Sequence, residues 1–142
     1  MIKNMNECIF CKISSGSLPA DKVYDDSQVL AFLDIAPVNP GHTLLIPRQH
    51  YGDLLETPAP IIISLVEVLP KIARAIVAAV EADGFNIGIN NGAAAGQVVN
   101  HVHMHIIPRF IDDGYRAWGH RQYSAGEAIE TARRVRTHLE MS

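Results

Sequence analysis

The sequence predicts an α+β fold in which helices pack on an antiparallel sheet of about five strands. Three observations lead to this fold class: short apolar segments separated by turn residues, one long apolar pattern with helical period, and a strand-like alternation of histidine and apolar residues. The chain has 142 residues, of which 48% are hydrophobic. This is enough to bury one core without disulfides, so we expect a single domain over residues 1–142.

Three short strands are expected before the long helix. Residues 22–24 and 29–33 are apolar segments on either side of Asp25-Asp26-Ser27, which predicts a hairpin. Residues 34–41 contain two prolines and a glycine and therefore predict a loop. The apolar run at 42–47 predicts the next strand.

One long amphipathic helix is expected over residues 60–83. Apolar residues recur there at intervals of three and four, at Ile62, Leu65, Val66, Leu69, Ile72, Ala73, Ile76, Val77 and Val80. Pro70 is expected to kink or split this helix, because its ring removes one backbone hydrogen bond and crowds the preceding turn. Gly84 is expected to end it.

The second half of the chain predicts two more strands and a last helix. A strand is expected at 85–90, a loop rich in glycine and alanine at 91–97, and a histidine-bearing strand at 101–108. A serine followed three residues later by a glutamate has the spacing of a capping box and predicts a helix over about 124–139. We expect the helices to lie to one side of the sheet.

Composition excludes some classes of partner. The formal net charge is −3 and no cationic run occurs, whereas proteins that bind a nucleic-acid backbone normally carry a basic stripe. No apolar run reaches the roughly 18 residues that span a bilayer, and residues 1–7 lack the regions of a signal peptide. We therefore expect a cytoplasmic protein with no nucleic-acid polymer and no membrane as partner. A small phosphorylated ligand is compatible with this charge.

The histidines at 101, 103 and 105 are the most informative pattern. On a strand they would form a row on one face, with the apolar residues Val102, Met104 and Ile106 packed beneath. At about 3.3 Å per residue, His101 and His105 would lie roughly 13 Å apart, which is too far for three rings to converge easily on one metal ion. We expect separate roles for the three. A catalytic metal site on the row is the alternative, but no carboxylate lies within this strand.

Cys8 and Cys11 form a Cys-x-x-Cys pair that predicts half of a zinc site. Tetrahedral zinc needs two more ligands, for which His50 and His101 are the best candidates. A redox pair or two inert thiols are the alternatives. A thioredoxin-like motif follows a strand, however, and nothing resembling a strand precedes Cys8.

His103 is the expected nucleophile. A neutral imidazole attacks phosphorus well near neutral pH if its other ring nitrogen donates to a fixed acceptor, such as a backbone carbonyl of a neighbouring strand residue. The resulting covalent intermediate divides one difficult displacement into two easier ones. His105 could then bind a phosphate oxygen or assist the leaving group.

Two further segments could bind the rest of a nucleotide. The loop at 90–97 exposes backbone N–H groups, and the amides of Asn90 and Gln97 could donate to phosphate oxygens. Asp34 could accept hydrogen bonds from ribose hydroxyls. The alternatives are a flexible turn for the loop and a solvated turn acid for Asp34.

Residues 101–107 read His-Val-His-Met-His-Ile-Ile, and the chain resembles the histidine triad (HIT) family, whose signature is His-φ-His-φ-His-φ-φ with φ apolar. The resemblance extends through further segments, at 8–13, 31–37, 40–47 and Gly96-Gln97. It implies a HIT-like fold whose core motifs occupy 8–109, with a sheet that continues across a homodimer. It also implies an enzyme that acts at the α-phosphate of a nucleotide.

The resemblance assigns roles to individual residues. His103 is the nucleophile that forms a nucleotidyl intermediate, His105 contacts the phosphate, and His42 supports the histidine cluster. Nucleotide-binding positions are Phe10, Leu33, Asp34, Asn90, Gly96, Gln97, Val98 and His105. The ligands of a structural zinc are Cys8, Cys11, His50 and His101. The resemblance implies a purine nucleotide of adenosine type as the substrate, either an adenosine phosphoramidate or a dinucleoside polyphosphate.

Val98 departs from the pattern of the nucleotide-binding branch, which usually has serine or threonine after the Gly-Gln pair. A missing hydroxyl removes a donor near the leaving group, which is worth roughly one or two kcal/mol or about tenfold in rate. The alternative function is therefore a nucleotide-binding regulatory or interaction module with little turnover. The segment 112–142 forms a C-terminal extension with no motif that maps onto the family.

Overall fold

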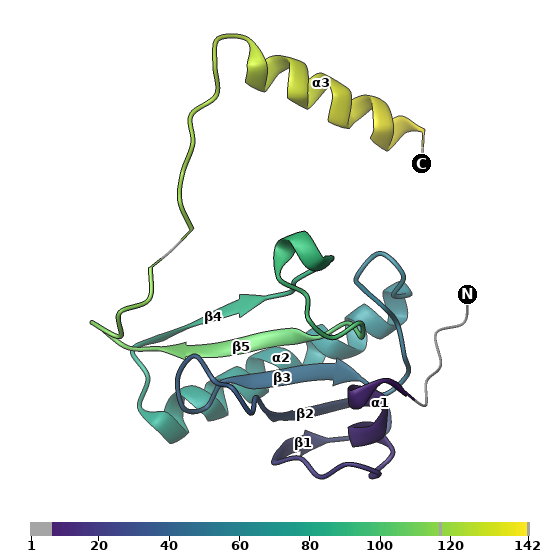
Figure 1. The fold of residues 1–142 in the computed structure, drawn as a ribbon, viewed down its shortest axis with the longest axis vertical. Helices are drawn as coiled ribbons and strands as arrows, with labels where there is room; N and C mark the ends of the chain where they lie inside the picture. The colour runs from purple at the N-terminus through teal and green to yellow at the C-terminus, as the bar shows by residue number, and fades with distance from the viewer. Residues whose placement is uncertain (1–6, 117, 142) are drawn as a thin grey trace.

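The computed structural model describes residues 7–116 and 118–141, and its centre is a five-stranded antiparallel sheet in the order β1-β2-β3-β5-β4 (Figure 1). The expected α+β class is confirmed. The expectation about a signal peptide falls mostly on residues 1–6, which lie outside the described part. The elements are α1 (Ile9–Ser14), β1 (Lys22–Asp25), β2 (Val29–Leu33), β3 (Thr43–Pro47), α2 (Ala59–Val80), β4 (Gly84–Gly88), the 3₁₀ helix η2 (Ala93–Ala95), β5 (Met104–Arg109) and α3 (Glu127–Glu140).

The inner strands bury side chains on both faces of the sheet. One set faces α2 and forms a core of Val29, Ala31, Leu45, Leu65, Ile72, Ala73, Ile76, Met104 and Ile106. The alternate set faces α1 and forms a second core of Phe10, Ile13, Leu30, Phe32, Leu44 and Ile46. The expectation that the helices lie to one side of the sheet is therefore wrong, because α1 and α2 cover opposite faces. The continuous apolar runs of β2 and β3 follow from burial on both faces.

The expected hairpin is confirmed, because β1 pairs antiparallel with β2 and β2 pairs antiparallel with β3. Asp26 closes the turn between β1 and β2. Its carboxylate accepts the backbone N–H groups of Gln28 and Val29 at 2.7 and 2.8 Å. This Asx-type turn explains why three polar residues separate two apolar strands.

The long helix differs from expectation at two points. Pro70 neither splits nor ends α2, which runs unbroken for 22 residues. Pro70 lies on the exposed side of the helix, where water can bind the carbonyl that its ring leaves without a partner. The helix ends at Val80, since Glu81 takes the left-handed conformation with φ 54°. Gly84 is therefore not the stop but the first residue of β4, opposite Arg109.

The histidine strand is shorter than expected. β5 begins only at Met104, so of the three histidines only His105 lies on a regular strand. The preceding residues bond elsewhere: the Val102 N–H donates to the Tyr51 carbonyl at 2.7 Å. Met104 and Ile106 still pack toward α2, on the face opposite His105. The strand before the loop also ends earlier than expected, at Gly88.

The C-terminal helix lies apart from the sheet at the end of an extended segment (Figure 1). Ser124 and Glu127 form half of the expected capping box, because the Ser124 N–H and hydroxyl both donate to the Glu127 carboxylate at 2.8 and 3.0 Å. α3 begins at Glu127 and buries none of its residues. Among the described residues, no helix is both long and apolar enough to cross a bilayer.

Candidate functional site

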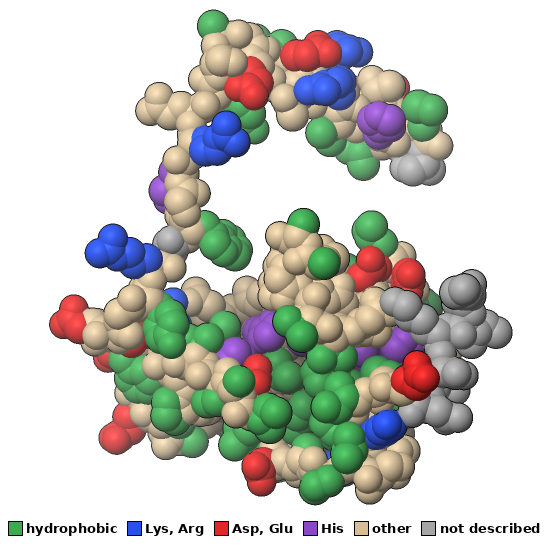
Figure 2. Space-filling view, viewed as in Figure 1, with side chains coloured by type: hydrophobic (Ala, Val, Ile, Leu, Met, Phe, Trp, Pro, Cys, Tyr) green, Lys and Arg blue, Asp and Glu red, His purple; other side chains and the backbone are tan. Residues whose placement is uncertain are grey.

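A cavity of about 730 Å³ opens on the α1 face of the sheet. Its wall is mostly apolar, and Figure 2 shows histidine side chains at the margin of a hydrophobic area on this face of the molecule. The lining comes from α1 and the turn after it, from β2 and its following loop, from β3 and β5, and from the segment before β5. It consists of Ile9, Phe10, Ile13, Leu18, Pro19, Ala20, Asp21, Phe32, Leu33, Asp34, Ile35, Ala36, Leu44, Gly96, Val98, Val99, His103 and His105.

The bend before β5 sets the orientation of His103. Its Nδ1–H donates to the His101 carbonyl at 2.6 Å, so in the neutral ring the lone pair is on Nε2. The acceptor is a backbone carbonyl, as expected, and it lies two residues earlier in the same segment. Phe10 packs edge-on against the His103 ring, with centroids 5.1 Å apart. The ring is thus held on two sides while it lines the cavity.

A chain of hydrogen bonds sets the tautomers of His42 and His105. The Val38 N–H donates to His42 Nδ1 at 3.0 Å, so the neutral His42 ring carries its proton on Nε2. His42 Nε2 lies 2.9 Å from His105 Nδ1 and donates to it. His105 must then carry its own proton on Nε2. The Val38 N–H therefore determines, through His42, that His105 Nε2 carries a proton and is a hydrogen-bond donor.

Burial keeps both of these rings neutral. It lowers the pKa of His42, an effect that the Asp34 carboxylate, 3.6 Å from His42 Nε2, opposes. Burial, together with the neighbouring His103 and His42, lowers the pKa of His105 to about 4. A neutral pair is what the hydrogen-bond chain requires, since a charged His42 could not accept from Val38.

Cys8, Cys11, His50 and His101 form a second cluster, whose four donor atoms lie within 4.8 Å of one another. Cys11 Sγ lies 3.4 Å from His50 Nδ1 and 3.6 Å from His101 Nδ1, and Cys8 Sγ lies 3.5 Å from His101 Nδ1. In a tetrahedral site with Zn–S of about 2.3 Å and Zn–N of about 2.0–2.1 Å, the S···N edge is about 3.6 Å. The four side chains therefore fit around one tetrahedral ion.

The chemistry of the donors also fits a metal ion. Burial, together with the adjacent Cys8, raises the pKa of the Cys11 thiol to about 11, so two thiolates here need a nearby cation. Burial lowers the pKa of His101 to about 4, which keeps this ligand neutral. His101 Nε2–H donates to the Pro47 carbonyl at 2.9 Å and leaves Nδ1 free to bind the ion.

Only some of the residues expected to bind phosphate, at positions 90–98, line the cavity. Gly96 and Val98 line the cavity, and Val98 is 93% exposed. Gln97 instead stabilises the loop, since its amide donates to the Gly52 and Val99 carbonyls at 2.7 and 3.0 Å. Asn90 lies beside Gly96, where a Cβ on the glycine would meet the Asn90 amide nitrogen at 3.5 Å. Neither amide side chain lines the cavity.

The cavity is lined both by expected residues and by residues that no sequence pattern predicted. Asp34, Phe10 and Leu33 line it, in the positions that the resemblance implies for nucleotide contacts. Leu18 and Asp21, in contrast, belong to the turn between α1 and β1 and were missed. This turn carries no motif. It reaches the cavity because α1 folds back across the β2 face, and α1 was itself not predicted.

Comparisons with known proteins agree with this geometry. Adenylylsulfatase HINT3 of Arabidopsis thaliana is 49% identical over 104 residues, which are 73% of this chain and 53% of the plant protein; the chain thus spans about half the length of that relative. Adenosine 5'-monophosphoramidase hnt1 of Schizosaccharomyces pombe is 41% identical over 102 residues, 72% of this chain and 74% of the yeast protein.

A solved structure supports the fold. The crystal structure of a Zn-bound histidine triad family protein from Mycobacterium smegmatis has a TM-score of 0.74 and 38% identity, and the match covers 97% of this chain and 99% of that one. The model of the HIT domain matches residues 15–112, which include both β2 and all three histidines. The chain belongs to the HIT domain family.

Proposed function

We propose that this protein is a nucleotide hydrolase or transferase that acts at the α-phosphate of an adenosine-type nucleotide through a nucleotidyl intermediate on His103. The substrate class is an adenosine phosphoramidate, a related mixed anhydride such as adenylylsulfate, or a dinucleoside polyphosphate. The observation that carries the proposal is the hydrogen bond from His103 Nδ1–H to the His101 carbonyl, which leaves Nε2 as the nucleophilic nitrogen in the wall of an apolar cavity.

The proposed reaction has two displacements. His103 Nε2 attacks the α-phosphorus and forms a P–N bond, while the bond to the leaving group breaks. Water then attacks the same phosphorus and releases one proton to solvent, while the P–N bond breaks, its electron pair returns to His103 Nε2, and the nucleoside monophosphate leaves. His105 Nε2–H is the group that donates to the phosphate oxygens, and its tautomer suits this role in both steps.

The rest of the cavity suits a nucleoside. Apolar side chains such as Phe10, Ile13 and Leu33 can pack against a base. Asp34 can accept from ribose hydroxyls with Oδ2, since its Oδ1 already accepts the Ala36 N–H at 2.9 Å. The similarity to an adenylylsulfatase and an adenosine monophosphoramidase supports an adenosine-type substrate.

We propose zinc as the metal of the cysteine–histidine cluster, with Cys8, Cys11, His50 and His101 as its ligands. Four protein ligands leave no open position, so the ion would crosslink α1 to the segments around His50 and His101 and take no part in the reaction. The Zn-bound relative supports this identity.

The test is release of AMP from adenosine phosphoramidate, adenylylsulfate and diadenosine polyphosphate by the wild type and His103→Ala. We expect the variant to lose at least a thousandfold in kcat, because no nucleophile replaces the ring. An acid-labile nucleotidyl adduct should be trapped on the wild type only. Equal turnover by both proteins would reject the nucleophile.

Val98 favours a second candidate, a nucleotide-binding module with little turnover. The side chain is exposed at the edge of the cavity and offers no donor to a leaving group. Calorimetric titration with AMP, paired with the turnover assay, separates the two functions. Micromolar binding without release of AMP from any of the three substrates would favour the module.

A homodimer is part of the proposal. β4 is an edge of the sheet and exposes Phe85 and Ile87 at 47% and 40%. An exposed apolar edge strand is typical of a surface that another chain covers. A sheet that continues across this edge would satisfy its free backbone groups.

A further inference from the structure

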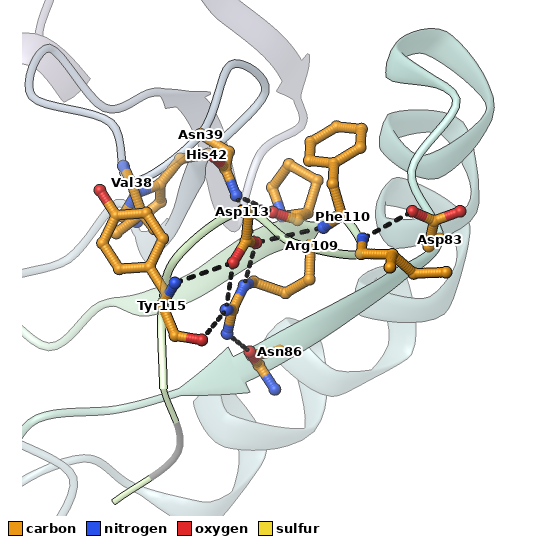
Figure 3. Close-up of polar contacts among 11 residues, drawn as sticks. Val38, Asn39, His42, Asp83, Asn86, Arg109, Phe110, Asp113 and Tyr115 are labelled. Carbon is orange, nitrogen blue, oxygen red and sulfur yellow. Dashed lines mark hydrogen bonds and ion pairs between the residues drawn. The ribbon is translucent and has the colours of Figure 1, made fainter.

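Asp113, four residues after the end of β5, is the centre of a dense hydrogen-bond cluster (Figure 3). Its side chain is only 7% exposed, and Arg109 donates to both carboxylate oxygens, from Nε at 2.7 Å and from Nη2 at 2.8 Å. The backbone N–H groups of Phe110 and Tyr115 also donate to it. The Arg109 guanidinium holds the pKa of this carboxyl far below its usual range, so it stays ionised.

Asn39 joins this cluster to the proline-containing loop between β2 and β3. Its Nδ2 donates to Asp113 Oδ2 at 3.0 Å and to the Pro108 carbonyl of β5, also at 3.0 Å. The backbone carbonyl of Asn39 accepts the His42 N–H at 3.0 Å. Both ends of Asn39 are thus fixed, one to β5 and Asp113 and the other to the backbone of His42.

The residue before Asn39 orients the His42 ring through its backbone N–H. Val38 donates to His42 Nδ1, and Figure 3 draws Val38, Asn39 and His42 together beside the Asp113 cluster. The turn is also tightly packed: a Cβ on Gly41, whose φ is +97°, would meet Val80 at 3.0 Å. A small shift of this loop would move the Val38 N–H away from the ring, and His42 could then take either tautomer.

We propose that Asn39 and Asp113 are positioning residues for the histidine pair. Through the loop they fix the Val38 N–H, and this N–H sets the proton positions on His42 and His105. Neither residue lines the cavity, so neither touches a bound nucleotide there. The proposal deepens the proposed function and rests on it for its effect on rate, but the tautomers can be measured without turnover.

The experiment compares Asn39→Asp and Asp113→Asn with the wild type. Asn39→Asp keeps the shape but sets a carboxylate against the Pro108 carbonyl and Asp113, so the loop must move. Asp113→Asn removes the charge that Arg109 and Asn39 bind. We expect kcat for AMP release to fall about ten- to a hundredfold, as a shift below 1 Å in catalytic geometry produces, while KM changes far less.

A merely structural role would not change the tautomers, so the decisive readout is the ¹⁵N spectrum of the histidine rings. We expect the wild type to show His42 protonated on Nε2 alone, and both variants to show mixed His42 and His105 tautomers. Melting temperature and AMP affinity show whether each variant is folded. If one variant is unfolded, the test uses the ring spectrum of the other.

Asp83→Asn is the matched control. Asp83 accepts the Ile111 N–H at 2.8 Å and so anchors the same chain segment from its other side, without contact to the loop at 37–41 (Figure 3). It should retain the wild-type spectrum and rate. The proposal is overturned if folded Asn39→Asp keeps wild-type tautomers, or if Asp83→Asn changes them equally. If the wild type itself releases no AMP, the proposed function fails while the ring spectra still decide the positioning.

Discussion

At the scale of single residues, the histidines differ in what fixes them. His101 is fully buried and bonds to Pro47, His103 bonds to a carbonyl of its own segment, and His105 depends on His42. Their alternation predicted that the three would have separate roles. It could not predict the bend before Met104, because the bend depends on a hydrogen bond between Val102 and the distant Tyr51.

The neutral His105 predicts a stability that depends on pH. Its folded pKa of about 4 lies below the ordinary value of 6.5, so between these values the unfolded chain binds the extra proton. The stability is therefore complete above about pH 6.5 and falls by up to about 3 kcal/mol as the pH decreases toward 4.

Urea unfolding from pH 7 to 4.5 measures this effect, and His105→Asn should lose less stability over the range than the wild type does. His120→Asn, at an exposed position, is the control and should follow the wild type. Parallel curves for the wild type and His105→Asn would contradict the assignment.

Val98→Ser should restore the hydroxyl that the family pattern has at this position. We expect kcat to rise about tenfold for substrates with a poor leaving group, because one new hydrogen bond in the transition state is worth about 1 kcal/mol or more. The comparison is steady-state AMP release, with Val98→Ala as a variant that loses bulk but gains no donor. If serine and alanine act alike, the hydroxyl has no role.

At the scale of elements, apolar periodicity predicted the strands and the long helix but not α1. This helix has only six residues, too few for a periodic signal or for stability on its own. Phe10 and Ile13 pack it on the sheet, and two of the four proposed zinc ligands hold its N-terminus. Its existence depends on tertiary contacts that no local pattern encodes.

Cys11→Ser should therefore release zinc and lower the melting temperature. The variant removes one of four ligands and the crosslink between α1 and the segment at His101. Metal analysis of the purified protein and thermal unfolding are the measurements, with His103→Ala as a control that keeps its metal. Loss of zinc from His103→Ala but not from Cys11→Ser would show that the ion lies elsewhere.

Pro70→Ala should stabilise α2. The substitution restores one backbone hydrogen bond at an exposed position and removes a clash with the preceding turn, for a gain of about 1–3 kcal/mol. The free energy of unfolding in urea tests this, with Glu67→Ala on the same helix as a control for a change of surface residue. A loss of stability would indicate that the proline is needed for the curvature of α2.

At the scale of the whole molecule, the class, the strand succession and the family were predictable, whereas the boundary of the site was not. The residues at 8–13 and 101–107 carry recognisable motifs, yet the cavity also takes Leu18 and Asp21 from a turn without one. The C-terminal extension gave only a capping signal. Its first residues prove to matter, since Asp113 contacts a loop 74 positions earlier in the sequence.

The two edges of the sheet predict where a second copy binds. Phe85→Asp on β4 should convert the proposed homodimer into a monomer, because a charge would be buried in the interface. Light scattering after size exclusion gives the mass. Val23→Asp on the opposite edge strand β1, where Val23 is 49% exposed, is the matched control and should stay dimeric. A dimeric Phe85→Asp together with a monomeric Val23→Asp would instead place the interface on β1.

Phe10 gives the two sites a shared wall. Phe10 lies between Cys8 and Cys11 in the sequence. Its ring contacts the rings of His101 and His103 edge-on and lines the cavity. A nucleotide that orders this ring from one side would favour metal binding from the other. The converse follows with the same coupling free energy, because linkage between two ligands is reciprocal. Nucleotide should thus raise the affinity for zinc, as measured by equilibrium competition with a chelator.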